Sequence, residues 1–215
     1  MERMVGDMDE KTYVDGLLDH LIPLQDDLLD QETTRRDICP SVGRDIGRLL
    51  HLLIRLTQPD QVLEIGTGIG YAAVWMGLAL RETGGRLVTV EAHERLAVES
   101  RNNIERAGVS DVVRVIHGQV EDVLPGLDGP FGMILQDGGT RSYPDILGLL
   151  TEKLSPGGLL VADDVLFALR SERPGPRQYM ADHNRKLFEA PELFSTLLAV
   201  GDGLTLSIRK EEEAL

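Results

Sequence analysis

Three aspartates come directly after two apolar, strand-like segments, where their carboxylates could bind a cation. Asp137 follows F-G-M-I-L-Q at 131–136, and Asp163 and Asp164 follow G-G-L-L-V-A at 157–162. Neighbouring strands lie about 5 Å apart, so carboxylates at their ends can converge on one hard cation such as Mg²⁺ or Ca²⁺. The alternative is that one aspartate caps the next helix and another faces water. The local sequence leaves both interpretations open.

A second set of residues is typical of a nucleotide-cofactor loop. Residues 61–70 read Q-V-L-E-I-G-T-G-I-G, an apolar strand that leads into Gly66, Gly68 and Gly70. Glycine lets a backbone turn sharply and approach a ligand closely. Residues 71–80 are apolar and compatible with a helix. We therefore predict a helix whose free N-terminal amides point at the ligand in this loop.

Glycine spacing and a later carboxylate indicate the cofactor class. A dinucleotide fingerprint G-x-G-x-x-G that starts at Gly66 requires Gly or Ala at the position of Tyr71. The same fingerprint fits nominally if it starts at Gly68, with Gly70 and Ala73 as its later positions. That start lies three residues after the strand ends at Ile65, which is late for a turn that should leave the strand directly. Residues 86–90 form a second β-type run that ends at Glu91. A carboxylate there is well placed to accept both ribose hydroxyls of an adenosine cofactor, although a solvated acid is the alternative.

The elements that must position these residues alternate along the chain. Short apolar runs separated by helical stretches predict strands, and two runs around G-D-G near the end predict a hairpin; the runs are 62–65, 87–90, 112–116, 132–135, 159–162, 194–200 and 204–209. The expected fold class is therefore α/β. We predict a doubly wound, Rossmann-like, mostly parallel seven-stranded sheet with helices on both faces and a C-terminal antiparallel β-hairpin. Ligands then collect at the carboxyl ends of the strands, where strand order reverses.

Helical segments precede the first strand. Residues 8–30 carry apolar positions at helical spacing, with Pro23 expected to interrupt them, and residues 41–56 predict another helix. No linker rich in Pro, Gly or Ser divides the 215 residues. We predict a single domain with residues 1–40 as an N-terminal helical extension and 41–215 as the cofactor-binding domain.

Composition limits the partners and the compartment. The formal net charge of −14 disfavours nucleic acid and anionic membranes and favours a small-molecule partner. The single cysteine, Cys39, excludes an intrachain disulfide, and we expect it to be buried. The N-terminus lacks an apolar signal core, and no apolar stretch is long enough to span a bilayer, which together predict a cytoplasmic protein.

Several motifs in order resemble the cation-dependent O-methyltransferases of the catechol and caffeoyl-CoA type, which are class I S-adenosylmethionine-dependent methyltransferases. The similarity runs from about residue 40 to 210 and is carried by V-L-E-I-G-T-G-I-G-Y, L-V-T-V-E, Q-D-G-G-T-R-S-Y, S-P-G-G-L-L-V-A-D-D-V-L and G-D-G-L-T-L-S-I-R-K. The resemblance implies methyl transfer from S-adenosylmethionine to a hydroxyl of a small catechol-like or phenolic acceptor, assisted by a divalent cation. It also implies a homodimer.

The resemblance carries over to individual positions. It implies a metal site at Asp137, Asp163 and Asp164, where the family has Asn in place of Asp164. It implies that Asp137 is also the catalytic residue, near the sulfonium. The cofactor-binding positions that it implies are Val42, Glu64, Gly66, Gly68, Gly70, Tyr71, Glu91, Gly118, Gln119, Val120 and Asp137.

The chain departs from the family at positions that matter for catalysis. Thr140 stands where the general-base lysine is expected, and Ala72 stands where a serine bonds the methionine carboxylate. Loss of a positioned general base costs roughly 3 to 5 kcal/mol of barrier lowering, whereas a Lewis-acidic cation can supply several kcal/mol. His183 is a candidate replacement base, with packing or surface exposure as the alternative.

The segment 166–177, L-F-A-L-R-S-E-R-P-G-P-R, is a candidate substrate lid, expected as a stiff, irregular loop, or else a mobile connector. Three other functions remain open on the sequence alone. The chain could be a methyltransferase of this fold that lacks the metal or acts on a modified RNA base. The departures at Thr140 and Ala72 also suit a non-catalytic S-adenosylmethionine-binding protein, and an NAD-binding protein is the last alternative.

Overall fold

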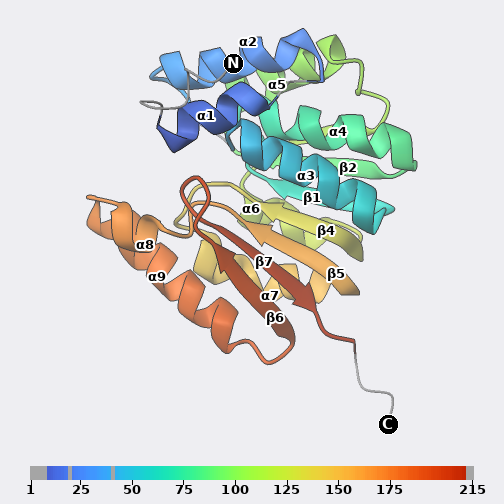
Figure 1. Ribbon diagram of the computed structural model, residues 1–215. Helices are drawn as coiled ribbons and strands as arrows, with labels where there is room; N and C mark the ends of the chain where they lie inside the picture. Colours follow the sequence, from blue (N-terminus) through green and yellow to red (C-terminus); the bar gives the residue numbers. More distant parts are fainter. Residues whose placement is uncertain (1–8, 19–20, 40–41, 212–215) are drawn as a thin grey trace.

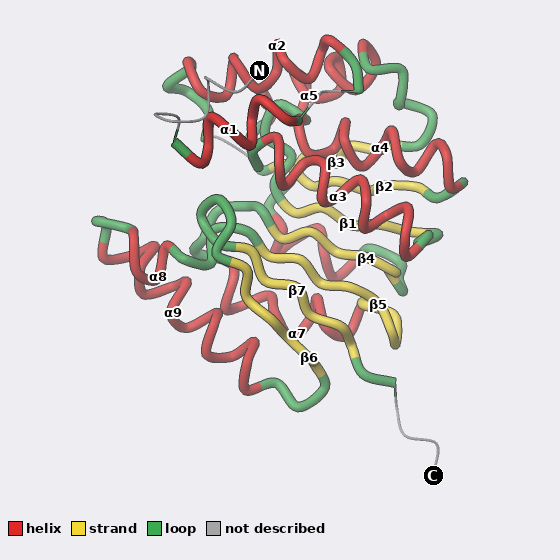
Figure 2. Tube along the Cα trace, in the orientation of Figure 1, coloured by secondary structure: helices red, strands yellow, loops and turns green. Residues whose placement is uncertain are grey.

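The computed structural model describes residues 9–18, 21–39 and 42–211, and its centre is a seven-stranded sheet in the order β3-β2-β1-β4-β5-β7-β6 (Figures 1 and 2). Strands β1 to β5 run parallel, while β7 lies antiparallel between β5 and β6. The strands are β1 (Gln61–Ile65), β2 (Arg86–Glu91), β3 (Val113–His117), β4 (Phe131–Gln136), β5 (Leu154–Ala162), β6 (Leu193–Leu198) and β7 (Leu204–Arg209). The predicted fold class and the C-terminal hairpin are confirmed.

Helices cover both faces of the sheet, and α3, α4 and α5 lie on the opposite side from α6, α7 and α9 (Figure 1). Helices α1 and α2 pack outside them, against α3 and α4 respectively. The bounds are α1 (Glu10–Leu17), α2 (Pro23–Thr34), α3 (Arg44–Thr57), α4 (Tyr71–Thr83), α5 (Glu94–Arg106), α6 (Val120–Val123), the 3₁₀ turn Leu124–Gly126, α7 (Tyr143–Lys153), α8 (Phe167–Arg170) and α9 (Pro174–Glu189).

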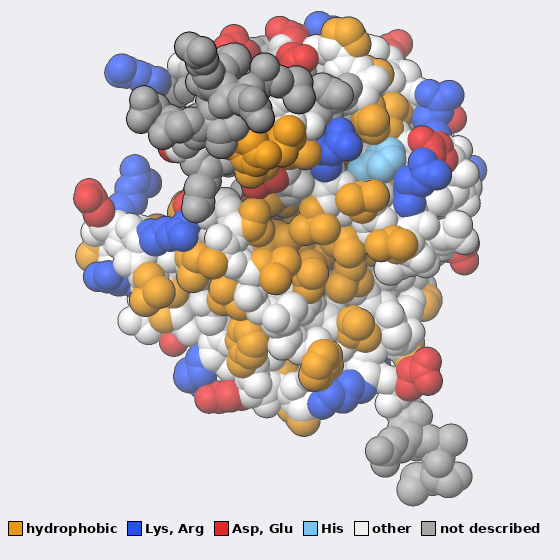
Figure 3. Space-filling model, in the orientation of Figure 1, with side chains coloured by type: hydrophobic (Ala, Val, Ile, Leu, Met, Phe, Trp, Pro, Cys, Tyr) orange, Lys and Arg blue, Asp and Glu red, His pale blue; other side chains and the backbone are white. Residues whose placement is uncertain are grey.

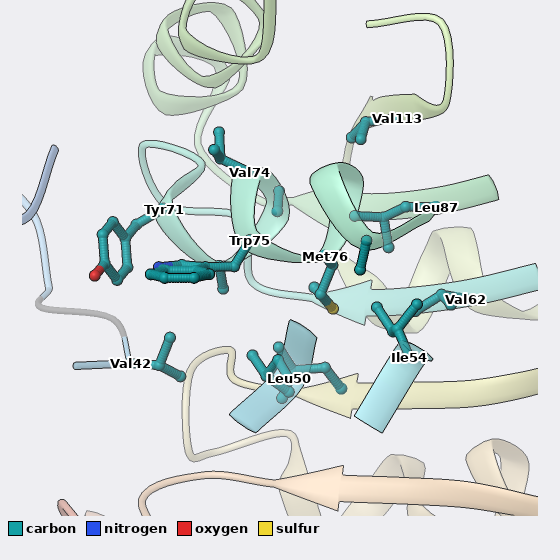
Figure 4. Packing of buried hydrophobic residues seen from close by; sticks show 14 of the residues in the cluster. Val42, Leu50, Ile54, Val62, Tyr71, Val74, Trp75, Met76, Leu87 and Val113 are labelled. Carbon is teal, nitrogen blue, oxygen red and sulfur yellow. The ribbon is translucent and has the colours of Figure 1, made fainter. Parts of the chain in front are cut away.

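Both faces of the central strands are buried because successive side chains point to opposite sides of the sheet. In β1, Val62 packs with α3 and α4, and its neighbour Leu63 packs with α6 and α7. Figure 4 shows Trp75 of α4 in the middle of the first of these clusters, near Leu50 of α3. A Cβ atom at Gly47 would lie 2.4 Å from the Trp75 ring, so α3 approaches α4 closely only because this position has no side chain.

One of two expectations based on proline is confirmed. The helical stretch is interrupted at Pro23, because α1 ends at Leu17 and α2 begins at Pro23. The irregular loop expected over 166–177 is wrong, because that segment contains α8 and the first turn of α9. Proline lacks an N–H, but the first residues of a helix have no intrahelical acceptor for theirs. Pro23 and Pro174 each occupy such a first turn.

The link between α2 and α3 gives a further correction. Cys39 is exposed, not buried, because its neighbour Ile38 takes the buried position with 8% exposure. Leu28 of α2 lies in the same core cluster as α4. The predicted boundary between residues 40 and 41 falls outside the described residues, and the division into extension and domain stays a prediction. Within the described part of the chain, no helix has the length and apolar character needed to cross a membrane.

Candidate functional site

The strand order reverses between β1 and β4, and the backbones that leave these two strands touch. The amide of Asp137 donates a 2.9 Å hydrogen bond to the carbonyl of Ile65. Gly66 follows with a φ of +91°, and a Cβ atom there would lie 2.3 Å from the Asp137 carbonyl oxygen. Only glycine fits both the left-handed backbone and this close approach. The sheet thus brings the glycine loop and Asp137 together, as the sequence predicted.

The rest of the glycine loop curves around an open position. Gly68 has a φ of +54°, and a Cβ atom there would meet nothing within 4 Å. Gly70, with a φ of +96°, begins α4. Helix α5 also supports the loop, because the side-chain amide of Asn103 donates a 3.0 Å hydrogen bond to the Ile69 carbonyl. This arrangement presents the first amides of α4 beside the loop, where they can bind an anionic group.

Glu91 links the glycine loop to the end of β2. One carboxylate oxygen accepts a 2.9 Å hydrogen bond from the Gly68 amide, and the other accepts a 2.8 Å bond from the His93 amide. The residue is 5% exposed. The oxygen that accepts from the His93 amide also lies 3.1 Å from the His93 ring Nδ1, whereas the oxygen bonded to Gly68 keeps a second lone pair and can still accept a ribose hydroxyl. The two backbone donors fix its orientation for that purpose.

The loop after β3 lies next to Glu91. The amide of Gly118 donates to the Glu91 carbonyl at 2.9 Å. Gln119 then precedes α6 and is exposed, whereas Val120 is buried. These three positions, which the resemblance implies for cofactor binding, therefore follow the carboxyl end of β3 beside the end of β2.

Three other predicted cofactor positions are buried. Val42 and Tyr71 pack around Trp75 in the core cluster (Figure 4), and burial raises the pKa of Tyr71 to about 12. Glu64 is fully buried in β1, and neither carboxylate oxygen meets a donor in hydrogen-bonding geometry. Contact of Val42, Tyr71 and Glu64 with a cofactor stays a prediction.

Burial sets the ionisation of Glu64. Removal from water, with the nearby Glu91 and Glu32 carboxylates as smaller contributions, raises the pKa of Glu64 from 4.5 to about 8. An ionised carboxylate is strongly disfavoured in such surroundings, so the protonated form prevails at neutral pH.

The two aspartates after β5 are largely buried and lie near other carboxylates. Asp163 is 5% exposed, and its carboxylate accepts a hydrogen bond from the Asp164 amide at 2.8 Å. Asp164 has a φ of +63°, in the left-handed region that Asp and Asn adopt more readily than most residues. Burial, together with nearby carboxylates that include Asp202, raises the pKa of Asp163 to about 6 and that of Asp164 to about 7.

The expected three-carboxylate metal centre is not assembled in this geometry. Among the described residues, no three side chains of the His, Cys, Asp and Glu types are close enough together to hold a metal ion. Asp137, Asp163 and Asp164 all belong to the described part. As placed, these residues do not fit a shared cation, although Asp163 and Asp164 remain adjacent oxygen donors.

The position of the family lysine supplies no basic nitrogen. Thr140 lies in the turn before α7, where its carbonyl accepts the Tyr143 amide at 3.3 Å. His183 is fully buried on α9, and its ring packs edge-on against Tyr143 with centroids 5.1 Å apart. Burial lowers the pKa of His183 to about 4. These contacts support the packing alternative for His183 rather than a general base.

The sequence analysis missed the buried polar residues whose hydrogen bonds support the backbone of the site. Asn103 supports the glycine loop, and Gln136 and Tyr143 bond to each other next to Asp137. The hydroxyl groups of Thr67 and Thr89 lie 2.5 Å apart beneath the same loop. These contacts join distant parts of the sequence, and no local motif marks them.

A family model described as O-methyltransferase matches residues 24–210. The chain belongs to this O-methyltransferase family. The expected resemblance is thereby confirmed at the level of the family. Among proteins with assigned functions, the chain is 38% identical over 130 residues to a catechol O-methyltransferase of Niastella koreensis, a match that covers 59% of this chain and 58% of that enzyme. The chain spans little more than half the length of the first curated relatives it matches.

Solved structures of other O-methyltransferases share the fold over nearly their whole length. TomG from Streptomyces achromogenes, an enzyme of tomaymycin synthesis solved with S-adenosylmethionine, has a TM-score of 0.81 and 28% identity, and the match covers 93% of this chain and 95% of TomG. An O-methyltransferase from Bacillus cereus, solved with S-adenosylhomocysteine, has a TM-score of 0.82 and 27% identity, with 92% and 96% covered.

The buried Glu64 predicts how the stability of this O-methyltransferase family member depends on pH. Because its pKa is 4.5 when unfolded and about 8 when folded, the folded state binds the extra proton between these values. Its contribution to stability is therefore complete below pH 4.5 and is lost as the pH rises toward 8, by at most about 1.4 kcal/mol per pH unit. Glu64→Gln should flatten this slope.

Urea denaturation at pH 5.5, 6.5 and 7.5 measures the effect. The exposed Glu192→Gln is the matched control and should keep the wild-type slope. Equal slopes in wild type and Glu64→Gln would show that Glu64 does not carry the proton.

Proposed function

We propose that this chain is an S-adenosylmethionine-dependent O-methyltransferase that methylates a hydroxyl of a small catechol-like or phenolic acceptor. The observation that carries the proposal is the glycine loop at the strand-order switch, with Glu91 fixed beside it by the Gly68 amide at 2.9 Å. Nucleotide cofactors bind at such switch points. Support also comes from TomG and the Bacillus cereus enzyme, solved with S-adenosylmethionine and S-adenosylhomocysteine, and from the name of the Niastella koreensis relative.

In the proposed reaction, the acceptor oxygen attacks the sulfonium methyl in line, the carbon–sulfur bond breaks, and S-adenosylhomocysteine leaves. The acceptor hydroxyl first loses its proton to water, and the resulting oxyanion is the group that attacks. The protein contributes alignment of the two reactants, exclusion of water and electrostatic stabilisation. Glu91 accepts the ribose hydroxyls, and the loop amides hold the rest of the cofactor. Because Thr140 cannot act as a base at neutral pH, acceptors with relatively acidic hydroxyls should react best.

Glu91→Gln tests the cofactor site. The substitution removes the negative charge and turns an NH₂ group toward a backbone N–H that needs an acceptor. Hydrogen bonds to charged groups contribute about 1.5 to 3 kcal/mol, so the Kd for S-adenosylhomocysteine should rise roughly ten- to a hundredfold. Isothermal titration calorimetry measures it, with the exposed Glu94→Gln as control. An unchanged Kd would place the cofactor elsewhere.

A divalent cation, Mg²⁺ or Ca²⁺, is the second part of the proposal. The adjacent carboxylates of Asp163 and Asp164 and the family resemblance support it, while the absence of a group of three metal-binding side chains among the described residues does not. When bound, such a cation would supply Lewis acidity to the acceptor oxygen. The alignment described above does not depend on it.

Calorimetric titration of Mg²⁺ in the presence of S-adenosylhomocysteine tests the cation. If the site exists, the wild type gives a binding isotherm, the double variant Asp137→Ala plus Asp163→Ala loses it, and EDTA abolishes turnover. The exposed Asp145→Ala serves as the control that keeps the isotherm. Turnover that survives EDTA, with no isotherm, favours a metal-independent methyltransferase of the same fold, including one that acts on a modified RNA base.

Cofactor binding without turnover on any hydroxylated acceptor would favour the non-catalytic alternative. That function rests on Thr140 and Ala72, the two departures from the family. Binding of nicotinamide nucleotides in place of S-adenosylhomocysteine would instead favour the NAD-binding alternative.

We also propose a homodimer in the cytoplasm. Hydrophobic side chains gather on the face of the molecule that Figure 3 shows. Exposed apolar side chains on α1 and α3, such as Leu17 at 65% and Leu56 at 78%, offer surface for association. Sedimentation equilibrium should give twice the chain mass at micromolar concentration. A single species of the chain mass would contradict the dimer.

A further inference from the structure

One backbone carbonyl joins the two strands that carry the predicted aspartates. Gln136 is the last residue of β4 and directly precedes Asp137. Its carbonyl accepts the Asp163 amide at 3.0 Å, as the parallel pairing of β4 and β5 continues one step beyond β5. The same oxygen accepts a second hydrogen bond from the Tyr143 hydroxyl at 2.7 Å. Tyr143 therefore bonds the point at which the backbones of Asp137 and Asp163 meet.

This contact is shielded from water on all sides. Gln136 and Tyr143 have no exposed surface. The Gln136 side chain donates back to the Tyr143 carbonyl at 3.4 Å, and the His183 ring packs edge-on against the phenol ring. With no competing water, the hydroxyl–carbonyl bond is stronger than it would be at the surface. The packed ring also restricts the phenol to one orientation.

The Tyr143 hydroxyl acts only as a donor. Burial, and then the charges of Asp137, Asp164 and Asp163, hold the pKa of Tyr143 well above its usual value of 10. The phenol therefore keeps its proton at neutral pH and cannot serve as a base. Its role must lie in the hydrogen bond that it donates, not in proton transfer.

We propose that Tyr143 is a positioning residue for methyl transfer, and this inference rests on the proposed function. Its hydroxyl holds the Gln136 carbonyl and so fixes the backbone on which Asp137 and Asp163 are carried. Misplacement of reacting groups by about 1 Å can cost on the order of a hundredfold in rate. The hydroxyl bonds the backbone at the end of β4, whereas Glu91 bonds the glycine loop, so loss of the hydroxyl should affect turnover more than cofactor binding.

Tyr143→Phe tests the inference because it removes the hydroxyl and keeps the ring against His183. We expect the kcat for a catechol acceptor to fall about tenfold and the acceptor KM to rise, while the Kd for S-adenosylhomocysteine stays within about twofold. Tyr13→Phe on α1, where the side chain is exposed, is the matched control with unchanged kinetics. A kcat equal to wild type, even with a lowered Tm, would overturn the inference and leave Tyr143 a purely structural residue.

Amide hydrogen exchange gives a readout that does not need activity. In Tyr143→Phe, the Asp163 amide should exchange at least tenfold faster, because its acceptor carbonyl is no longer held, and unchanged exchange would count against the inference. If Tyr143→Phe does not fold, Gln136→Met replaces it. That variant loses the return bond to Tyr143, and we expect a two- to threefold fall in kcat, with no fall overturning the inference. If the wild-type protein neither bound S-adenosylhomocysteine nor turned over an acceptor, the proposed function itself would be contradicted.

Discussion

The site depends on the backbone contact between the ends of β1 and β4. Gly66 lies so close to the Asp137 carbonyl that any side chain would collide with it. This contact fixes the glycine loop on one side of the strand-order switch and Asp137 on the other. Glu91 then bonds the loop from the β2 side, and Tyr143 bonds the chain from the β4 side. The position of each site residue therefore follows from the parallel pairing of a few buried strands.

The same region carries an electrostatic cost. Glu64, Asp163 and Asp164 are wholly or largely removed from water, and burial raises the pKa of each. In the ionised form such groups oppose folding, because burying a carboxylate is unfavourable unless it is protonated or paired. Acidic groups kept at this cost are typical of functional sites. The sulfonium of the proposed cofactor is cationic, so these carboxylates would meet a positive charge when the site is filled.

The sequence predicted the sheet well because its signals are local. Apolar runs of four to seven residues placed every strand to within a few residues, except that β5 begins five residues before its predicted start at 159. Expectations failed where a local signal had two physical outcomes. Pro174 begins a helix instead of belonging to an irregular loop, and Cys39 is exposed because Ile38 takes the buried position. The metal site at Asp137, Asp163 and Asp164 stays a prediction, because the order of strand ends does not by itself decide where their side chains point.

By itself, the sequence determined the fold class, the family and the approximate site, because strand periodicity, glycine spacing and the order of motifs are written along the chain. Only the tertiary structure decided how the site is held. The bonds from Tyr143 to Gln136 and from Asn103 to Ile69 join residues that no local pattern relates. The tertiary structure also decided the pKa of Glu64. The pKa of a carboxyl group depends on its exposure to water and on nearby charges, and both are set only when the strands and helices pack.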